Sequence, residues 1–334
     1  MKPIVSVIIP VYNADKVIGR CLRSLIEQTL QDIEIIVVDD GSTDETSRIV
    51  KDYAKEYKII SYIHQDNQGP GAARNTGLDN AIGQYIGFVD ADDYIKSTMF
   101  ETMYKKISQE DADCIVCNHE TDIKKVDLFE KDILIISKET RAKGYIKYIA
   151  KYPVLWNKLY NKRCINNLKL DIKMKMGEDL LFNTKAYERM NKIVVLDEVL
   201  YHYSDEEKSI TRTKKEVNYK NMIRSYCDDD LAKEVDQEVY QALVFVTGFL
   251  FSTVMNKKNL KYVYNEIKYL LDNKSIAIYK FIKSDVYYDI TEVKTISKKI
   301  YYAYKLLFWI AYFKLVGVCS LGFWILAKLV RIGR

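Results

Sequence analysis

The sequence predicts an α/β protein in which a mainly parallel sheet, flanked by helices, is followed by a mostly helical C-terminal region. Short β-branched apolar runs alternate with segments of helical spacing near the start of the chain, which is typical of a parallel sheet. All four prolines and nine of the thirteen glycines precede residue 178, so turns are frequent early and rare later. From Val217 onward the apolar spacing is helical.

The first 95 residues carry the clearest alternation of strands and helices. Continuous apolar runs predict buried parallel strands at Ile4–Ile9, Ile33–Val38, Ile59–His64 and Tyr85–Val89. Apolar residues at helical spacing predict helices at Val17–Gln28, Thr43–Tyr57 and Ala72–Ile82. Pro10 is expected to end the first strand. In such sheets ligands bind beyond the carboxyl ends of the strands.

The rest of the chain is divided by its changing pattern. A helix at Ser97–Gln109 and a strand at Ala112–Asn118 are followed by a less regular stretch to about residue 200. A length of 334 residues suits about two domains. We expect one domain over residues 1–215 and a helical region over 216–334.

Composition and charge exclude several classes of protein. The chain is 48% hydrophobic and 29% charged, which excludes collagen-like and disordered chains. Its six scattered cysteines lack the spacing of a disulfide framework and favour a reducing compartment. Residues 1–292 hold 43 basic and 46 acidic residues, a net charge of −3, which argues against nucleic-acid binding. No signal peptide is expected at the start.

The excess positive charge lies in an aromatic and apolar tail, residues 295–334. Its uncharged pieces, Leu306–Phe313 and Leu315–Ala327, are shorter than the roughly 20 residues that span a bilayer. Apolar and aromatic surface with Lys and Arg and no acid favours helices that lie in the interface of an anionic membrane. A pair of oligomerisation helices is the alternative. The expected location is cytoplasmic, on the inner face of the cell membrane.

Two adjacent carboxylates, Asp39 and Asp40, follow the second predicted strand. Ser42 or Thr43 can cap the next helix, so a capped turn explains part of this motif. It does not explain both carboxylates, one of which must emerge over the edge of the sheet. A carboxylate there can accept hydrogen bonds from a nucleobase or a ribose.

A second acidic group, Asp90-Ala91-Asp92-Asp93, follows the fourth predicted strand. Side chains two apart on a strand point the same way, so Asp90 and Asp92 can face one ion while Ala91 turns inward. Carboxylate oxygens suit Mg²⁺ or Mn²⁺, which such sites share with substrate phosphates. A lone Asp-x-Asp is usually only an acidic loop, but two such clusters on neighbouring strand ends favour a site.

Three further motifs are weaker. Gln68–Asn75 opens a helix with small residues, and Arg74 at this helix N-terminus suits a nucleotide diphosphate. Gly177-Glu178-Asp179 enters an apolar helix, and its local pattern favours simple capping. Cys114 and Cys117 have CxxC spacing within a predicted strand and are expected in the core rather than at a zinc site. His202 can be a metal or phosphate ligand or a packed neighbour of aromatic residues.

Taken in chain order, these motifs resemble those of the family 2 glycosyltransferases, inverting enzymes with a Rossmann-like GT-A fold. The match covers about the first 200 residues and includes Val5–Asn13, Ser24–Thr29, Val38–Asp44, Gly71–Asn75, Gly87–Asp93 and Gly177–Asp179. The resemblance implies that residues 1–95 bind the nucleotide sugar and that residues 96–215 bind the acceptor.

The resemblance also implies roles for individual residues. The implied donor-binding residues are Pro10, Tyr12, Asn13, Asp39, Asp40, Arg74, Asp90 and Ala91. Asp40 is implied to bind the base, usually uracil. The implied metal ligands are Asp92, Asp90 and His202, with Mn²⁺ or Mg²⁺ as the ion, and Arg212 is implied to lie in a loop over the diphosphate. Asp179 is the implied catalytic base, with Glu178 supporting it.

The function implied by these roles is transfer of a sugar from a nucleotide diphosphate, most often a UDP-sugar, with inversion to a β-linkage. The acceptor is a hydroxyl of a glycan, a lipid-linked or a protein-linked molecule. The alternative is a catalytically inactive protein that binds sugar nucleotides as a scaffold in a glycan assembly complex. Donor turnover distinguishes the two.

Overall fold

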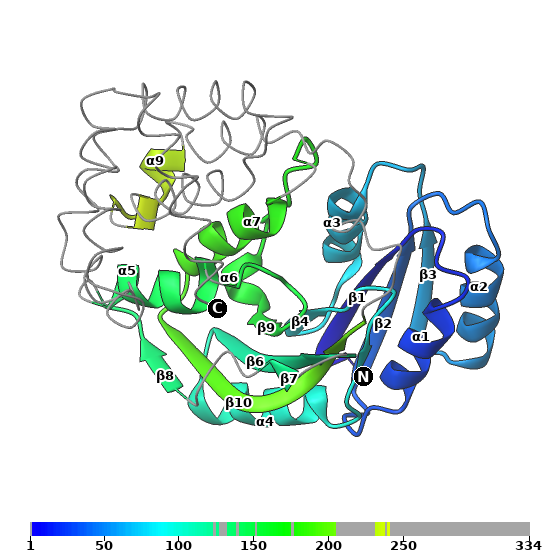
Figure 1. Cartoon of the computed structure of the whole chain (residues 1–334), viewed down its shortest axis with the longest axis horizontal. Coiled ribbons are helices and arrows are strands. Elements are labelled where there is room, and N and C mark those ends of the chain that lie inside the picture. Colours follow the sequence, from blue (N-terminus) through cyan, green and yellow to red (C-terminus); the bar gives the residue numbers. More distant parts are fainter. Residues whose placement is uncertain are drawn as a thin grey trace, which may run out of the picture. The chain divides into compact units, whose positions relative to one another are not determined.

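The computed structural model describes residues 2–122, 125–126, 132–137, 140–150, 152–174, 177–204, 231–237 and 239–240 (Figure 1). The chain divides into two compact units, Met1–Ser137 with Pro153–Val217, and Lys138–Tyr152 with Asn218–Arg334. This division falls two residues after the expected end of the first domain and assigns an internal segment to the second unit. Within the described residues, no helix is long and apolar enough to cross a bilayer.

The first unit contains a mixed sheet in the order β3-β2-β1-β4-β9-β6-β10-β5. Its strands are β1 Val5–Val11, β2 Ile33–Asp39, β3 Ile60–His64, β4 Tyr85–Phe88, β5 Tyr94–Ile95, β6 Cys114–Thr121, β9 Lys158–Asn161 and β10 Lys192–Tyr203. Two short strands, β7 Lys125–Val126 and β8 Asp132–Ile135, pair with β6 and β10. Strands β1 to β4 are parallel, as are β6 and β10, whereas β9 is antiparallel to both neighbours. The predicted α/β class, a mainly parallel sheet flanked by helices, is confirmed. Most of the predicted helical region over residues 216–334 lies outside the described residues.

The helices of the first unit are α1 Ile18–Ile26, α2 Thr46–Glu56, α3 Pro70–Asn80, α4 Met99–Glu110, α6 Lys162–Ile165 and α7 Glu178–Tyr187. Those described in the second unit are α5 Arg141–Gly144, the π-helix η1 Tyr145–Ala150 and α9 Leu231–Glu234. The helices that the sequence predicts over the first 110 residues are therefore present with slightly different ends. Boundaries differ by a few residues because helix ends are set by local capping and packing.

Two glycines allow helices to pack closely on opposite faces of the sheet. A Cβ at Gly77 of α3 would lie 2.3 Å from Ile8 Cγ2, and a Cβ at Gly87 of β4 would lie 2.6 Å from Phe100 Cε1 of α4. Gly87 pairs in register with Val7, the neighbour of Ile8, so the two contacts are on opposite faces. The sheet is therefore covered on both sides, as expected for buried parallel strands. Figure 1 shows α4 and α7 on opposite sides of the sheet.

Pro10 does not end the first strand, contrary to the prediction. Strand β1 continues to Val11, and Pro10 pairs in register with Val38 of β2. The main-chain oxygen of Ile8 accepts from Val89 on the β4 side, and groups two residues further along a strand point to the same side. Because β4 ends at Phe88, the missing N–H of Pro10 breaks no strand pairing.

Strands β9 and β10 lie mostly in the stretch to about residue 200 that the sequence predicts to be less regular. Strand β9 has only four residues, all buried, although Lys158 and Asn161 are polar. Strand β10 is long but irregular, because its register against β6 shifts between Val195 and Val199. Asp197 and Glu198, which are exposed, occupy this irregularity and interrupt the apolar pattern.

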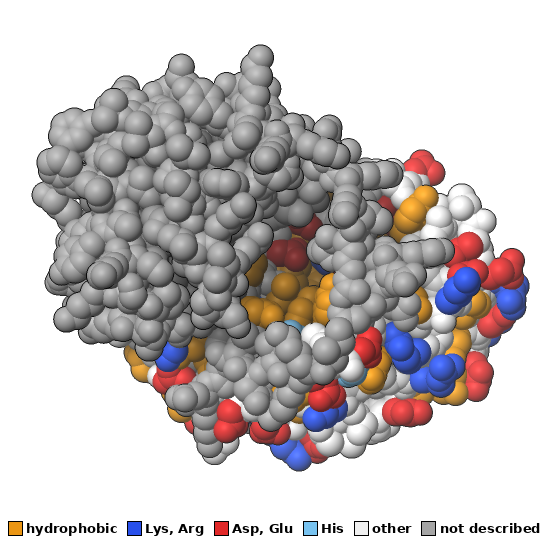
Figure 2. All heavy atoms as spheres, in the orientation of Figure 1, with side chains coloured by type: hydrophobic (Ala, Val, Ile, Leu, Met, Phe, Trp, Pro, Cys, Tyr) orange, Lys and Arg blue, Asp and Glu red, His pale blue; other side chains and the backbone are white. Residues whose placement is uncertain are grey.

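The expected core position of Cys114 and Cys117 is confirmed, since both are fully buried, free thiols in β6. On the outside, acidic and basic side chains are interspersed over the described part of the face in Figure 2. On α2, for example, Arg48 lies within ion-pair distance of Glu45 and Asp52.

Candidate active site

The carboxyl ends of β1, β2 and β4 meet at one edge of the sheet. Val11 at the end of β1 pairs with Asp39 at the end of β2, and the main-chain N–H of Asp40 donates to Val11. Asn13 joins the two turns, since its N–H donates to Ser42 Oγ and its Oδ1 accepts from the N–H of Thr43. The predicted site residues after β1 and β2 are therefore held together by hydrogen bonds.

Asp39 is fully buried and is held by polar groups. Its carboxylate accepts from the N–H of Ser42 at 2.9 Å and from the hydroxyl of Tyr62 at 2.7 Å. Burial alone would raise the pKa of Asp39, but these hydrogen bonds, together with one from His64, lower it below the usual range. Asp39 is therefore ionised at neutral pH.

Asp40 fixes the loop that leads into α3. One oxygen accepts from Gln65 Nε2 at 2.7 Å and from the N–H of Gln68 at 3.0 Å, and the other accepts from the N–H of Gly69 at 2.7 Å. The implied role of Asp40 in binding a nucleobase stays a prediction. Near it, Pro10 is buried in β1, while Tyr12 is an exposed aromatic residue at the end of the same strand.

Arg74 of α3 joins carboxylates from two distant parts of the chain. Its Nη2 donates to Asp90 Oδ1 at 2.9 Å, and its Nη1 lies 3.6 Å from oxygens of both Glu178 and Asp179. Burial disfavours the charge of Arg74, but the three carboxylates outweigh this effect and raise its pKa. One buried cation therefore connects the end of β4 with the start of α7.

Glu178 and Asp179 form the first turn of α7, after Gly177 with a φ of +84°. Burial raises the pKa of Glu178 to about 7, with a further contribution from Asp179 and an opposing one from Arg74. Burial also raises the pKa of Asp179, and Arg74 opposes this change. Asp179 Oδ1 is buried and accepts no hydrogen bond from the described residues. Local capping, which the pattern favoured, therefore does not account for the two carboxylates.

Lys158 is a charged residue near the site to which the sequence assigned no role. It is fully buried in β9, and its Nζ donates to the main-chain oxygen of Val154 and to Asn157 Oδ1. Burial lowers the pKa of Lys158 to about 8, while nearby acidic groups, including Asp179, oppose the shift. The sequence feature that could have indicated a buried lysine is its place within the apolar run Leu155–Tyr160.

The acidic group after β4 is a turn rather than a continuation of the strand. Strand β4 ends at Phe88, and the N–H of Asp93 donates to the main-chain oxygen of Asp90 at 3.1 Å. Asp90 and Asp92 are half-buried, whereas Ala91 and Asp93 are buried. The expected alternation of accessible and inward side chains is present, but the turn produces it.

Asp93 is a structural carboxylate that the sequence did not distinguish from its neighbours. Its oxygens accept from the hydroxyl of Tyr201 at 2.6 Å and the N–H of Ser204 at 2.8 Å. Burial, followed by the charges of Asp90 and Asp92, raises its pKa to about 9.

Of the two remaining predicted residues, His202 and Arg212, the structure describes only His202. His202 of β10 stacks on Tyr94, with ring centroids 4.1 Å apart, and its nitrogens face Asp122 at 2.8 Å and Glu120 at 3.4 Å. Its ring nitrogens thus face the carboxylates that end β6, and its role as a metal ligand stays a prediction. Arg212 lies outside the described residues.

Asp90 and Asp92, in the turn after β4, are suited to bind a divalent ion together with the diphosphate of a substrate. Among the described residues, no three His, Cys, Asp or Glu side chains form a cluster that could hold an ion. Asp90 and Asp92 nevertheless supply half-buried carboxylate oxygens, the donors that Mg²⁺ and Mn²⁺ prefer. Because such ions are usually bound by one or two carboxylates together with water and substrate phosphates, two protein donors suffice.

The fold and the site together define a GT-A type transferase, with a mainly parallel sheet whose strand ends carry acidic turns. The family model "Glycosyl transferase family 2" matches residues 6–190. The chain belongs to this family and is a glycosyltransferase.

Similar proteins come from several bacteria. The chain is 34% identical over 254 residues to the uncharacterized glycosyltransferase EpsJ of Bacillus subtilis, covering 72% of this chain and 70% of EpsJ. It is 37% identical over 219 residues to the glycosyltransferase GlyA of Streptococcus pneumoniae, covering 62% of this chain but only 31% of GlyA. The crystal structure of Staphylococcus aureus TarS residues 1–349 with UDP-GlcNAc has a TM-score of 0.75 at 22% identity, covering 100% of this chain and 93% of that one.

Proposed function

We propose that this glycosyltransferase moves a sugar from a UDP-sugar to an acceptor hydroxyl with metal assistance and inversion, giving a β-linkage. The observation that carries the proposal is the cluster around Arg74, in which Asp90, Glu178 and Asp179 surround one buried cation. It puts a candidate base beside the turn that suits a metal and a diphosphate. The bound UDP-GlcNAc of TarS, and the GDP-Man and Mn²⁺ of a Pyrobaculum calidifontis mannosyltransferase, support a nucleotide-sugar donor and an ion.

Asp179 is the group proposed to accept the proton of the acceptor hydroxyl. As the acceptor oxygen bonds to the anomeric carbon, the bond from that carbon to the diphosphate breaks, and the proton passes to Asp179. Burial raises the pKa of Asp179 and makes it a stronger base, while Arg74 keeps the ionised form accessible. Asp90 and Asp92 would hold a divalent ion, whose positive charge would offset the charge that develops on the leaving nucleoside diphosphate.

The acceptor is proposed to be a glycan, a lipid-linked or a protein-linked molecule. TarS is a poly(ribitol-phosphate) beta-N-acetylglucosaminyltransferase, and it is 32% identical to this chain over 218 residues that cover 60% of the chain and 35% of TarS. This likeness supports a polymeric acceptor. The experiment is a panel of UDP-sugars with Mn²⁺, scored by release of UDP with and without candidate acceptors. Binding of a UDP-sugar without any turnover would instead favour the scaffold alternative.

Activity is expected to need a divalent ion and the carboxylate of Asp92. Asp92→Asn should lower UDP release by at least about 100-fold, because a bound ion supplies several kcal/mol of charge stabilisation in the transition state. The control is Asp52→Asn, which removes an exposed carboxylate on α2. Full activity of the wild type in excess EDTA, or of Asp92→Asn without added ion, would contradict the metal assignment.

The tail, residues 295–334, lies outside the described residues, and we propose that it binds the inner face of the cytoplasmic membrane. Eight basic residues and no acidic one lie between residues 293 and 334. The full chain is expected to float with anionic liposomes at low salt and less at high salt, and a chain that ends at Lys294 should not float. If the full chain stays soluble and truncation only lowers its oligomeric mass, the tail is an assembly element.

A further inference from the structure

Arg20 of α1 contacts the acidic turn from outside the cluster around Arg74. Its Nη2 donates to the main-chain oxygen of Asp92 at 2.7 Å and to Ser204 Oγ at 2.7 Å. Its guanidinium also lies over the ring of Tyr94, 4.9 Å from the centroid. The residue therefore joins helix α1, the turn that carries Asp92, and the end of β10.

The same turn is held from the β10 side by a second set of hydrogen bonds. The hydroxyl of Tyr201 donates to Asp93 and accepts from the N–H of Asp90 at 3.2 Å, and the N–H of Ser204 donates to Asp93. These bonds fix Asp90 and Asp93, the two ends of the turn. The contact from Arg20 fixes the main chain at Asp92, which lies between them.

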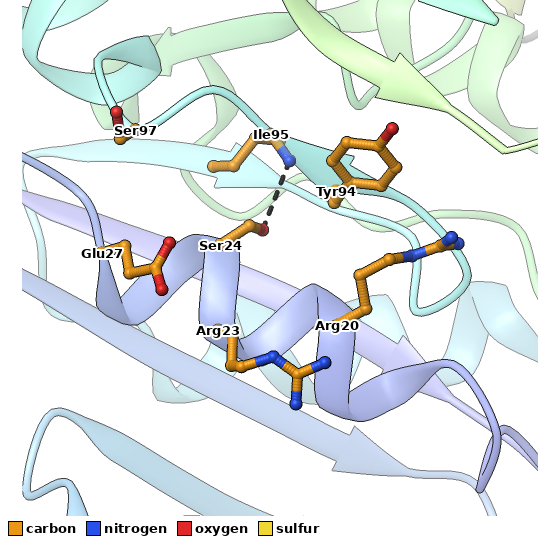
Figure 3. Close-up of a pocket in the computed structure, with 7 residues that line it drawn as sticks. All are labelled: Arg20, Arg23, Ser24, Glu27, Tyr94, Ile95 and Ser97. Atoms are coloured by element: carbon orange, nitrogen blue, oxygen red, sulfur yellow. Dashed lines mark hydrogen bonds between the residues drawn. The ribbon is translucent and has the colours of Figure 1, made fainter. Parts of the chain in front are cut away.

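Arg23 provides a comparison within the same surroundings. Both arginines line a cavity of about 250 Å³ beside α1, and Figure 3 shows Arg20 extending toward Tyr94 and Arg23 extending away from it. Arg23 donates instead to the hydroxyl of Tyr53 on α2, at 3.2 Å. The two residues therefore share a helix and a charge, but only Arg20 contacts the turn.

We propose that Arg20 is a positioning residue that sets the direction of the Asp92 carboxylate by holding the main chain of its turn. The proposal rests on the proposed function, in which Asp92 binds a divalent ion. Removal of a residue that orients a metal ligand typically weakens metal affinity by about 10–100-fold. Arg20 acts on the main-chain oxygen of Asp92, and so on the residue that carries the ligand rather than on the carboxylate itself.

The test compares Arg20→Met, Arg20→Lys and Arg23→Met in the full chain. UDP binding is measured by calorimetry at increasing Mn²⁺, and amide hydrogen exchange of residues 89–95 is measured without metal or nucleotide. We expect Arg20→Met to need about 10–100-fold more Mn²⁺ for half-maximal UDP binding and to exchange faster in this segment. Arg20→Lys keeps a donor and should be intermediate, and Arg23→Met should match the wild type.

A double variant tests whether the contacts act as one unit. Ser204→Ala removes an acceptor of Arg20 Nη2, so its effect on the Mn²⁺ requirement should be smaller in Arg20→Met than in the wild type. Fully additive effects, or an unchanged Mn²⁺ requirement in Arg20→Met despite a lowered melting temperature, would overturn the positioning role. If the wild type itself bound UDP with no dependence on Mn²⁺, the metal assignment in the proposed function would fail, which is a distinct result.

Discussion

Asp179→Asn is expected to lower kcat by about 10²–10⁴-fold while leaving the affinity for the nucleotide sugar nearly unchanged, because a positioned base contributes a factor of that size. Asparagine has nearly the same shape as aspartate but cannot accept the proton of the acceptor hydroxyl. The substitution also removes one of three carboxylates around a single buried arginine, so the folded state should lose little stability. The measurements are single-turnover sugar transfer and calorimetric binding of the UDP-sugar.

Glu178→Gln is the matched control, since Glu178 precedes Asp179 in the same helical turn and lies at the same distance from Arg74. Its effect on kcat should be much smaller if it only supports the base. Wild-type turnover by Asp179→Asn, together with a large loss in Glu178→Gln, would assign the base to Glu178. A loss of donor binding in Asp179→Asn would point to a role in donor recognition instead.

The sequence predicted the parts of the site that are local in the chain. Asp39, Asp40, Asp90 and Asp92 follow apolar runs that predict buried strands, and the carboxyl ends of parallel strands meet at one edge. Their position over that edge therefore followed from the predicted strand ends. The element order of the first 110 residues was predictable for the same reason, except for the two-residue strand β5.

The contacts between distant residues were not predictable from local patterns. Arg74 and Asp179 are separated by more than a hundred residues, and only the order of the family motifs connected them. Likewise, Arg20 belongs to an ordinary amphipathic helix, and nothing in its spacing indicated the bond to Asp92. Strand β9 was not predicted as a strand, because Leu155–Tyr160 indicated a core segment but Asn157 and Lys158 leave it without a clear strand or helix pattern.

Two residues that the family motifs identified also make contacts within the fold that their implied roles do not describe. Asp40 uses both carboxylate oxygens to hold the loop before α3, and His202 faces the carboxylates at the end of β6. Such contacts are invisible in the sequence because their partners lie in other elements. Motifs indicate which residues matter, whereas the hydrogen bonds show what each one holds in place.

Arg74→Met is expected to destabilise the fold by about 3–5 kcal/mol at neutral pH, because it leaves buried carboxylates without their cation. Asp90, Glu178 and Asp179 are each partly screened by solvent, so the lower end of this range is expected. The control is Arg48→Met on α2, whose ion pairs are exposed and should contribute less than about 1 kcal/mol. Urea unfolding of the two variants and the wild type measures the difference.

The destabilisation caused by Arg74→Met should also depend on pH, because burial already raises the pKa of Glu178 to about 7 in the presence of Arg74. Without this cation the folded-state pKa values of Glu178 and Asp179 rise further above those of the unfolded chain. A raised carboxyl pKa means that the folded state binds more protons, so its stability is highest at low pH and is lost as pH rises through the folded pKa. The deficit relative to the wild type should therefore grow from about pH 6 to about pH 8, because Glu178 ionises over this range in the wild type but stays protonated in Arg74→Met. A deficit that stays constant over this interval would mean that Arg74 contributes packing rather than compensation of charge.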